Sequence, residues 1–238
     1  MAVAEENSVK DLGVFMSADC SFKTHAENFI NECKRKIGWI LRTFYSRDVL
    51  TMKTLFKTLI LSRIDYCSPL FHPTLSATTT YKIEGVQRAF TKKILNMKVL
   101  NYREWLNILK IQSIERRRER FIIIYVYKVL KNLVPNPGIA FKPTERNGTV
   151  AIIPLFPTTI PNSIRQKKYN SFNFIGPKLF NILPRELRDF STTGNDIVLP
   201  FKNKLDLFLS NIPDQPTIQG ISRAANSNSV IDQLNYRM

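Results

Sequence analysis

The chain has 238 residues, and 44% of them are hydrophobic, which is enough for a folded core and excludes a wholly disordered chain. Its formal net charge of +16 at pH 7 favours polyanionic partners. The longest tight apolar run, FIIIYVY at residues 121–127, is too short to cross a bilayer, so neither a transmembrane helix nor a membrane partner is expected.

The N-terminal part predicts a short lead-in followed by a helix. Residues 1–22 are acidic at the start and contain no apolar signal core, and one strand is expected around Leu12–Met16. Thr24 and Glu27 have the spacing of a capping box at the start of a helix. Apolar residues then recur at helical spacing to about residue 45, which predicts one amphipathic helix.

Four more helices are expected before residue 134. The first of these runs from about Thr51 to Cys67 and is ended by prolines, and the next contains IEGVQRAFTKKIL at residues 83–95. A short helix over Tyr102–Leu109 follows a second capping-box pattern. Ser113 is expected to cap a helix that runs to Leu133, with an exposed polar start and a buried apolar end. The predicted fold is therefore mainly α, a compact bundle of about five helices over residues 23–134.

The pattern changes after residue 134, where prolines cluster and helical periodicity is lost. Residues 135–210 are expected to form a proline-rich, irregular C-terminal extension, extended over much of 134–170, with short helices at Pro177–Leu183 and Pro200–Leu209. Residues 211–238 are rich in Asn, Ser and Gln and are expected to be a disordered tail.

Catalytic and metal-binding patterns are absent from the sequence. The two histidines, His25 and His72, have no cysteine or carboxylate at metal-ligand spacing. The three cysteines are widely spaced, which suggests no disulfide framework and favours an intracellular, reducing compartment. A two-metal phosphoryl-transfer site needs clustered carboxylates, and no convincing set occurs. The chain is a poor candidate for a self-contained enzyme, and no cofactor is expected.

The positive charge is concentrated in the predicted helices. Residues 20–140 hold 22 lysines and arginines against 8 aspartates and glutamates. Basic side chains on helices contact the phosphates of nucleic acids, and arginine does so with two parallel hydrogen bonds. The candidate nucleic-acid-binding residues are Lys34, Arg35, Lys36, Arg88, Lys92, Lys93, Arg116, Arg117, Arg118, Arg120, Arg165, Lys167 and Lys168.

Two alternatives stay open for these charges. Glu115 and Glu119 are spaced to pair with the neighbouring arginines, so the run at residues 116–120 could equally be a salt-bridged, solvated helix start. The whole basic face could serve only solubility, in a helical module that docks on a protein partner through an apolar patch around Trp39 or Trp105.

Short motifs spread over residues 9–209 resemble the region downstream of the polymerase palm in non-LTR retrotransposon (LINE-type, jockey-like) reverse transcriptases. Their order and spacing carry the resemblance more than any one motif does. Phe180 stands where the family usually has tryptophan. The motifs lie at Lys10–Val14, Phe22–His25, Leu41–Phe44, Arg63–Ser68 with Pro73, Ile83–Arg88, Tyr102–Leu106, Ile114–Arg118, Tyr127–Leu130, Ser171-Phe172, Leu179–Pro184 and Phe201-Lys202.

The resemblance implies a thumb and C-terminal region. Such a thumb is a helical bundle that grips the template–primer duplex behind the active site, so an RNA–DNA hybrid and the missing palm domain are the implied partners. The catalytic aspartates and their Mg²⁺ would belong to that absent palm. The implied function is a non-catalytic fragment of an RNA-directed DNA polymerase, functional or a relic of an element, with a nuclear location.

Overall fold

The chain is mainly helical and divides into two compact units. The first comprises Met1–Glu115 with Pro216–Ser222, and the second comprises Arg116–Gln215 with Arg223–Met238. The computed structural model describes residues 7–95, 101–136, 143–144, 149–150, 161–188, 197–217 and 228–235. The division between the units falls in the first turn of the last long predicted helix. The expected boundary, after residue 134, is therefore not the one observed.

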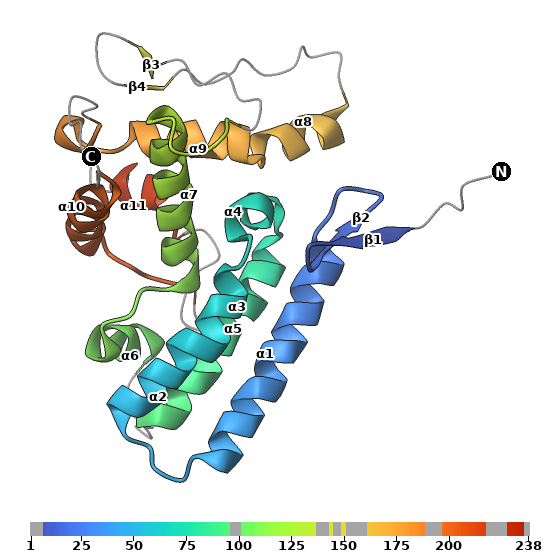
Figure 1. Cartoon of the computed structure of the whole chain (residues 1–238), viewed down its shortest axis with the longest axis vertical. Helices are drawn as coiled ribbons and strands as arrows, with labels where there is room; N and C mark the ends of the chain where they lie inside the picture. Colours follow the sequence, from blue (N-terminus) through green and yellow to red (C-terminus); the bar gives the residue numbers. More distant parts are fainter. Residues whose placement is uncertain are drawn as a thin grey trace. The chain divides into compact units, whose positions relative to one another are not determined.

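The first unit begins with a β-hairpin and continues as helices (Figure 1). Its elements are β1 (Ser8–Asp11), β2 (Val14–Ser17), α1 (Lys23–Thr43), α2 (Val49–Leu55), the π-helical η1 (Phe56–Leu61), α3 (Ser62–Asp65), α4 (Ser68–Phe71), the 3₁₀ turn η2 (His72–Thr74), α5 (Ala77–Leu95) and α6 (Tyr102–Leu109). Helix α1 packs against α3, η1 and α5, and α2 also contacts α5.

The hairpin replaces the single strand expected around Leu12–Met16. Strands β1 and β2 pair antiparallel with Asp11 opposite Val14, so Leu12 and Gly13 form a two-residue turn. Both turn residues have positive φ, 45° and 84°, as a type I′ hairpin turn requires. The hydroxyl of Tyr66 donates to the carbonyl oxygen of Leu12 at 2.7 Å, so the turn is held to the segment after α3.

Of the two predicted capping boxes, one is present in the structure and the other is not. Asn101 and Glu104 form the predicted capping box of α6, with both reciprocal hydrogen bonds present. The capping box predicted at Thr24 is wrong, because α1 starts after Phe22 and has no side-chain cap.

The helix predicted from Thr51 to Cys67 consists of three consecutive helical segments, α2, η1 and α3, here called the rod α2–η1–α3. Within it, the hydroxyl of Thr58 donates back to the carbonyl of Thr54 at 2.9 Å. Such back-bonding bends helices.

The core of the first unit follows the predicted apolar stripes. Buried residues on α1, on the rod α2–η1–α3 and on α5 form one cluster, in which the rings of Phe56 and Phe90 stack at 4.8 Å between centroids. His25 is buried beside Phe29 and Phe71, at 5.4 and 5.0 Å between ring centroids. Its role is therefore in packing.

The second unit is built on the last long predicted helix. Its elements are α7 (Ile114–Leu130, the first two residues belonging to the first unit), β3 (Pro143–Thr144), β4 (Thr149–Val150), α8 (Asn162–Tyr169), α9 (Phe172–Asn181), the 3₁₀ turn η3 (Arg185–Leu187), α10 (Val198–Ser210) and α11 (Val230–Asn235). The five predicted helices occur, but a single five-helix bundle is not confirmed, because α7 from Arg116 onward lies in the other unit.

The second core joins segments that sequence patterns did not connect. Buried residues of α7, α9, η3, α10 and α11 cluster together, and Tyr127 stacks on Phe201 at 3.8 Å between ring centroids. Helix α9 begins at Phe172, five residues before the predicted start, and continues through Pro177. Helix α8 lies in the stretch that was expected to be extended, much of which is outside the described residues.

The prediction of a disordered tail over 211–238 is wrong for its described C-terminal part. Helix α11 lies there, and its first residue, Val230, is fully buried in the second core. Ile231 and Leu234 pack against the same core. The apolar side chains at these three positions give a short helix enough buried surface to hold it in place, although the polar composition of the surrounding segment indicated disorder.

Candidate nucleic-acid interface

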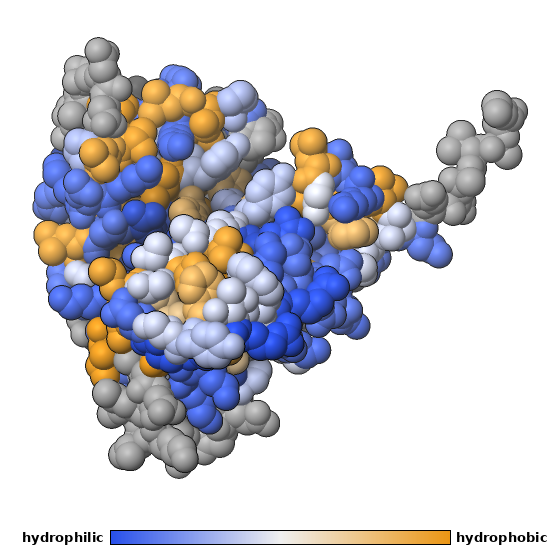
Figure 2. Space-filling view, turned by 60° about the horizontal axis from the view of Figure 1, so that its bottom comes forward, coloured by the Kyte–Doolittle hydropathy of each residue, from blue (hydrophilic) through white to orange (hydrophobic). Residues whose placement is uncertain are grey.

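The basic cluster on α1 is exposed on the side away from the core. Lys34 and Arg35 are exposed, whereas Lys36 is half-buried and its Nζ lies 3.3 Å from Oε1 of Glu32. Arg63 donates to the other carboxylate oxygen of Glu32 at 2.9 Å. Figure 2 shows hydrophilic side chains gathered over the helix that continues from the N-terminal hairpin. Lys34 and Arg35 therefore remain available for an anionic partner, while Lys36 shares a carboxylate.

Glu32 is the acidic counterpart of this cluster. Burial would raise the pKa of its carboxyl, but the positive charge of Arg63 and the hydrogen bonds from Lys36 and Arg63 together outweigh burial and lower the pKa. Glu32 is therefore held in its ionised form, which keeps Lys36 and Arg63 in place on the surface of the first unit.

On α5, as on α1, two of the three candidate residues are exposed and the third is engaged within the unit. Lys92 and Lys93 are exposed near the end of the helix. Arg88 is half-buried, and its guanidinium carbon lies 4.5 Å from the ring centroid of Tyr81 and 5.7 Å from that of Tyr102. These are cation–π distances, so Arg88 is engaged within the unit.

Gly85 lies beside this guanidinium. A Cβ atom at position 85 would meet the Nη2 of Arg88 at 3.5 Å, an ordinary contact, and nothing else within 4 Å. The open space at Gly85 is therefore next to the arginine that stacks on Tyr81, and close packing of another backbone does not explain this glycine.

Helix α5 also carries a buried polar network that sequence reasoning missed. Glu84 accepts hydrogen bonds from the hydroxyl of Tyr102 and from the backbone N–H of Ile114, the latter at 2.9 Å. Gln87 donates from Nε2 to the hydroxyl of Tyr102 at 3.1 Å and to the carbonyl of Gln112 at 2.9 Å. These bonds connect α5 to α6 and to the segment after it, and so position the helix that carries Lys92 and Lys93.

The arginine run of α7 lies in a different environment. Arg116 and Arg118 are buried, with 1% and 0% of their surface exposed, so the prediction of an exposed helix start is wrong. The Nη2 of Arg116 donates to the carbonyl oxygen of Pro213 at 2.9 Å. Glu119, also buried, accepts from the backbone N–H of Val230 at 2.8 Å. The start of α7 therefore lies beneath the C-terminal segment of the second unit.

The other two arginines of the run are half-buried. Arg120 forms a two-point ion pair with Asp206 of α10, with Nη2 at 2.8 Å from Oδ2. The guanidinium of Arg117 lies 5.2 Å from the ring centroid of Phe121. Asp206 is 86 residues away along the chain from Arg120, so the local spacing of Glu115 and Glu119 could not identify this partner.

The last candidate cluster lies on α8, in the second unit. Lys167 is exposed, Arg165 and Lys168 are half-buried, and Tyr169 packs edge-to-face on Phe174 at 4.9 Å between ring centroids. The structure thus brings the α1 and α5 candidates into one compact unit, whereas those of α7 and α8 belong to the other.

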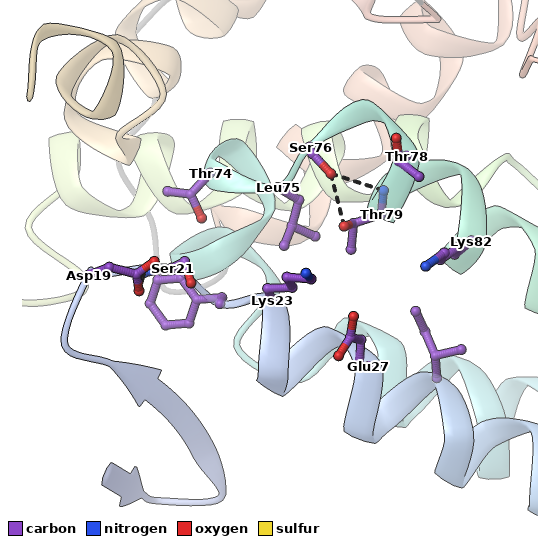
Figure 3. Close-up of a pocket in the computed structure, with 12 residues that line it drawn as sticks. Asp19, Ser21, Lys23, Glu27, Thr74, Leu75, Ser76, Thr78, Thr79 and Lys82 are labelled. Carbon is purple, nitrogen blue, oxygen red and sulfur yellow. Dashed lines mark hydrogen bonds between the residues drawn. The ribbon is translucent and has the colours of Figure 1, made fainter. Parts of the chain in front are cut away.

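A cavity of about 470 Å³ opens within the first unit, between the starts of α1 and α5 (Figure 3). The amino groups of Lys23 and Lys82 and the carboxylate of Glu27 point toward this space, and Asp19 also lines it. The hydroxyl of Ser76 accepts from the backbone N–H of Thr79 at 3.2 Å. Two lysines and two carboxylates balance each other, so the cavity has no net charge that would favour an anion.

Within the described part of the chain, other site types are absent. No group of three or more His, Cys, Asp and Glu residues there could hold a metal ion. None of the described helices is long and apolar enough to cross a membrane. Burial raises the pKa of the Cys33 thiol to about 11, so this thiol stays protonated at neutral pH.

Trp39 and Trp105, the two residues named for an apolar docking patch, differ in exposure. Trp105 is buried against Tyr102 and Leu106, whereas Trp39 is half exposed and packs edge-to-face on Phe44. The apolar patch expected of a docking module therefore cannot include Trp105.

No protein-family model, curated protein or solved structure matches this chain.

Proposed function

We propose that the chain binds nucleic acid through exposed basic residues of its first unit, without catalysing a reaction itself. The observation that carries the proposal is the environment of Lys34, Arg35, Lys92 and Lys93. All four are exposed, and none lies in an ion pair with a described carboxylate. They project from two long helices packed on one core, so their positions are set before a ligand arrives.

The ligand class follows from this chemistry. Exposed ammonium and guanidinium groups on helices contact phosphates, and such contacts position a nucleic acid without reading its sequence. An RNA–DNA hybrid is the first substrate to test, because the sequence motifs resemble the thumb region of a non-LTR retrotransposon reverse transcriptase. A palm domain as second partner, Mg²⁺ held by that palm, and an intracellular, nuclear location belong to the same proposal.

The experiment is a salt series with a labelled RNA–DNA hybrid. Wild type is compared with a variant in which Lys34, Arg35, Lys92 and Lys93 are changed to alanine. We expect non-specific binding that weakens steeply with salt, because neutralised phosphates release counterions, and a shallower slope in the variant. The matched control removes four basic residues of the second unit, Lys178, Arg185, Lys202 and Lys204. Affinity that does not change with salt, or equal losses in both variants, would refute the proposal.

A second candidate function is docking on a protein. Exposed apolar side chains surround the connection between α1 and α2, where Tyr45 is 92% and Leu50 74% exposed, with half-exposed Trp39 nearby in sequence. Surfaces of this kind mark protein contacts. If wild type fails to bind the hybrid at low salt but self-associates in sedimentation experiments, and a Leu50→Ser variant does not, docking is the better explanation.

A further inference from the structure

Lys53 and Lys57, which are one helical turn apart, have the distant Lys110 as a neighbour on the first unit. Lys53 lies on α2 and Lys57 one turn later in η1, whereas Lys110 follows the last residue of α6. The Nζ of Lys53 donates to the carbonyl oxygen of Leu109, the residue before Lys110. The contact brings the rod α2–η1–α3 to the end of α6, so that Lys53 lies beside the residue preceding Lys110 and one turn before Lys57.

The charges of this cluster act on one another. The pKa of Lys53 is lowered, first by burial and then by the positive charges of Lys57 and Lys110. The ion pairs of Glu32 with Lys36 and Arg63, and of Arg120 with Asp206, do not include these lysines. A bound anion would offset the repulsion that Lys57 and Lys110 exert on Lys53.

Helix capping explains only part of the arrangement. A cation at the last carbonyls of α6 is favourable because it meets the negative end of the helix dipole, and this accounts for Lys53. Lys57 and Lys110 are exposed and make no such contact. Lys57 also lies in the π-helical segment Phe56–Leu61, and π-helical turns are frequent at functional sites.

We propose that Lys53, Lys57 and Lys110 form a phosphate-binding site that extends the nucleic-acid surface of the first unit. The inference rests on the proposed function and adds residues that the sequence motifs did not indicate. Lys53 positions the cluster through its bond to Leu109, while Lys57 and Lys110 contact the phosphates. Three neighbouring lysines suit the backbone of a polyanion, where adjacent phosphates share the charge.

The test compares Lys57→Ala/Lys110→Ala with wild type in the hybrid-binding salt series. Lys53 is kept, because its ammonium group supports α6. The matched control is Lys178→Ala/Lys204→Ala, which removes the same charge from exposed positions of the second unit. We expect the first variant to lose about tenfold in affinity at low salt and to show a slope shallower by about two, one for each lost phosphate contact. The control should change by less than about threefold.

The outcomes separate the two proposals. If wild type does not bind the hybrid, the proposed function is wrong and this inference is wrong with it. If wild type binds but both double variants lose affinity equally, or neither does, only the lysine site is refuted. Amine-reactive footprinting gives an independent readout, in which the hybrid should protect Lys57 and Lys110 but leave Lys178 and Lys204 reactive. Unchanged labelling of Lys57 and Lys110 would also refute the site.

Discussion

The basic runs of α1 and α7 look alike in sequence, but their most exposed members on α1 correspond to buried arginines on α7. Residues 34–36 and 116–120 each place consecutive cations on an amphipathic helix. On α1, Lys34 and Arg35 face away from the core and are exposed. On α7, Arg116 and Arg118 are buried, and Arg116 donates to the carbonyl of Pro213, 97 residues later in the chain. A basic run therefore indicates a ligand surface only where no distant segment covers it.

The difference arises from what each helix packs against. Helix α1 has one apolar stripe, so its remaining face is left to solvent. Helix α7 is covered on its apolar part by α9 and α10 and at its start by the C-terminal segment. Its guanidinium groups therefore satisfy backbone carbonyls and a carboxylate of the same unit, which is a structural role.

The sharpest test of this comparison removes one arginine from each run. Arg116→Ala should lower the free energy of unfolding by about 3 kcal/mol, because a buried charged donor is lost and its carbonyl acceptor is left unsatisfied. Arg35→Ala should change it by no more than about 0.5 kcal/mol. Urea unfolding followed by circular dichroism measures both. If the two variants were equally stable, the distinction between a buried and a solvated basic run would be lost.

A glycine on α9 tests how tightly the second unit is packed. A Cβ at Gly176 of α9 would lie 2.9 Å from Cγ2 of Val126 on α7, which is closer than side chains approach. Gly176→Ala should therefore cost about 2 kcal/mol of unfolding free energy through overpacking. Thermal melting is a sufficient measurement, and an unchanged melting temperature would show that α9 can move away from α7 without loss.

The corresponding substitution in the first unit is Gly85→Ala, which should raise the stability of the protein instead of lowering it. The new methyl would meet only the end of the Arg88 side chain at 3.5 Å, while the helix gains the higher propensity of alanine. The variant should be more stable by up to about 1 kcal/mol. A destabilised variant in the same melting experiment would mean that the guanidinium stacked on Tyr81 needs the open space.

The smallest expected effect is on how the stability of the protein depends on pH. Because the folded-state pKa of Glu32 is lowered from its ordinary value of 4.5, its ion pairs stabilise the protein above that pH and lose this contribution as pH falls through the lowered pKa. Glu32→Gln should cost about 0.5 kcal/mol at pH 7 and nothing well below the lowered pKa, since the pair is on the surface. Unfolding measured from pH 7 to pH 3 tests this. A difference between the two proteins that does not depend on pH would argue against the ion pairs.

Local patterns predicted the helices well and their partners poorly. The apolar stripe from Phe29 to Phe44 predicted α1, and the pair Asn101 and Glu104 predicted the cap of α6, because both signals depend on neighbours within a turn or two. The burial of Glu84 and Gln87 was missed, since their partners come from α6 and the segment after it. Helix α11 was missed because polar composition outweighed Val230, Ile231 and Leu234, which do have helical spacing.

The sequence by itself determined that the chain is mainly helical, where its long helices lie and that it is strongly basic, because propensity, periodicity and charge are local properties. Only the tertiary structure decided which charges face solvent. It buried Arg116 and Arg118, paired Arg120 with Asp206 and brought Lys53 to the carbonyl of Leu109, because each of these depends on contacts between segments far apart in the chain.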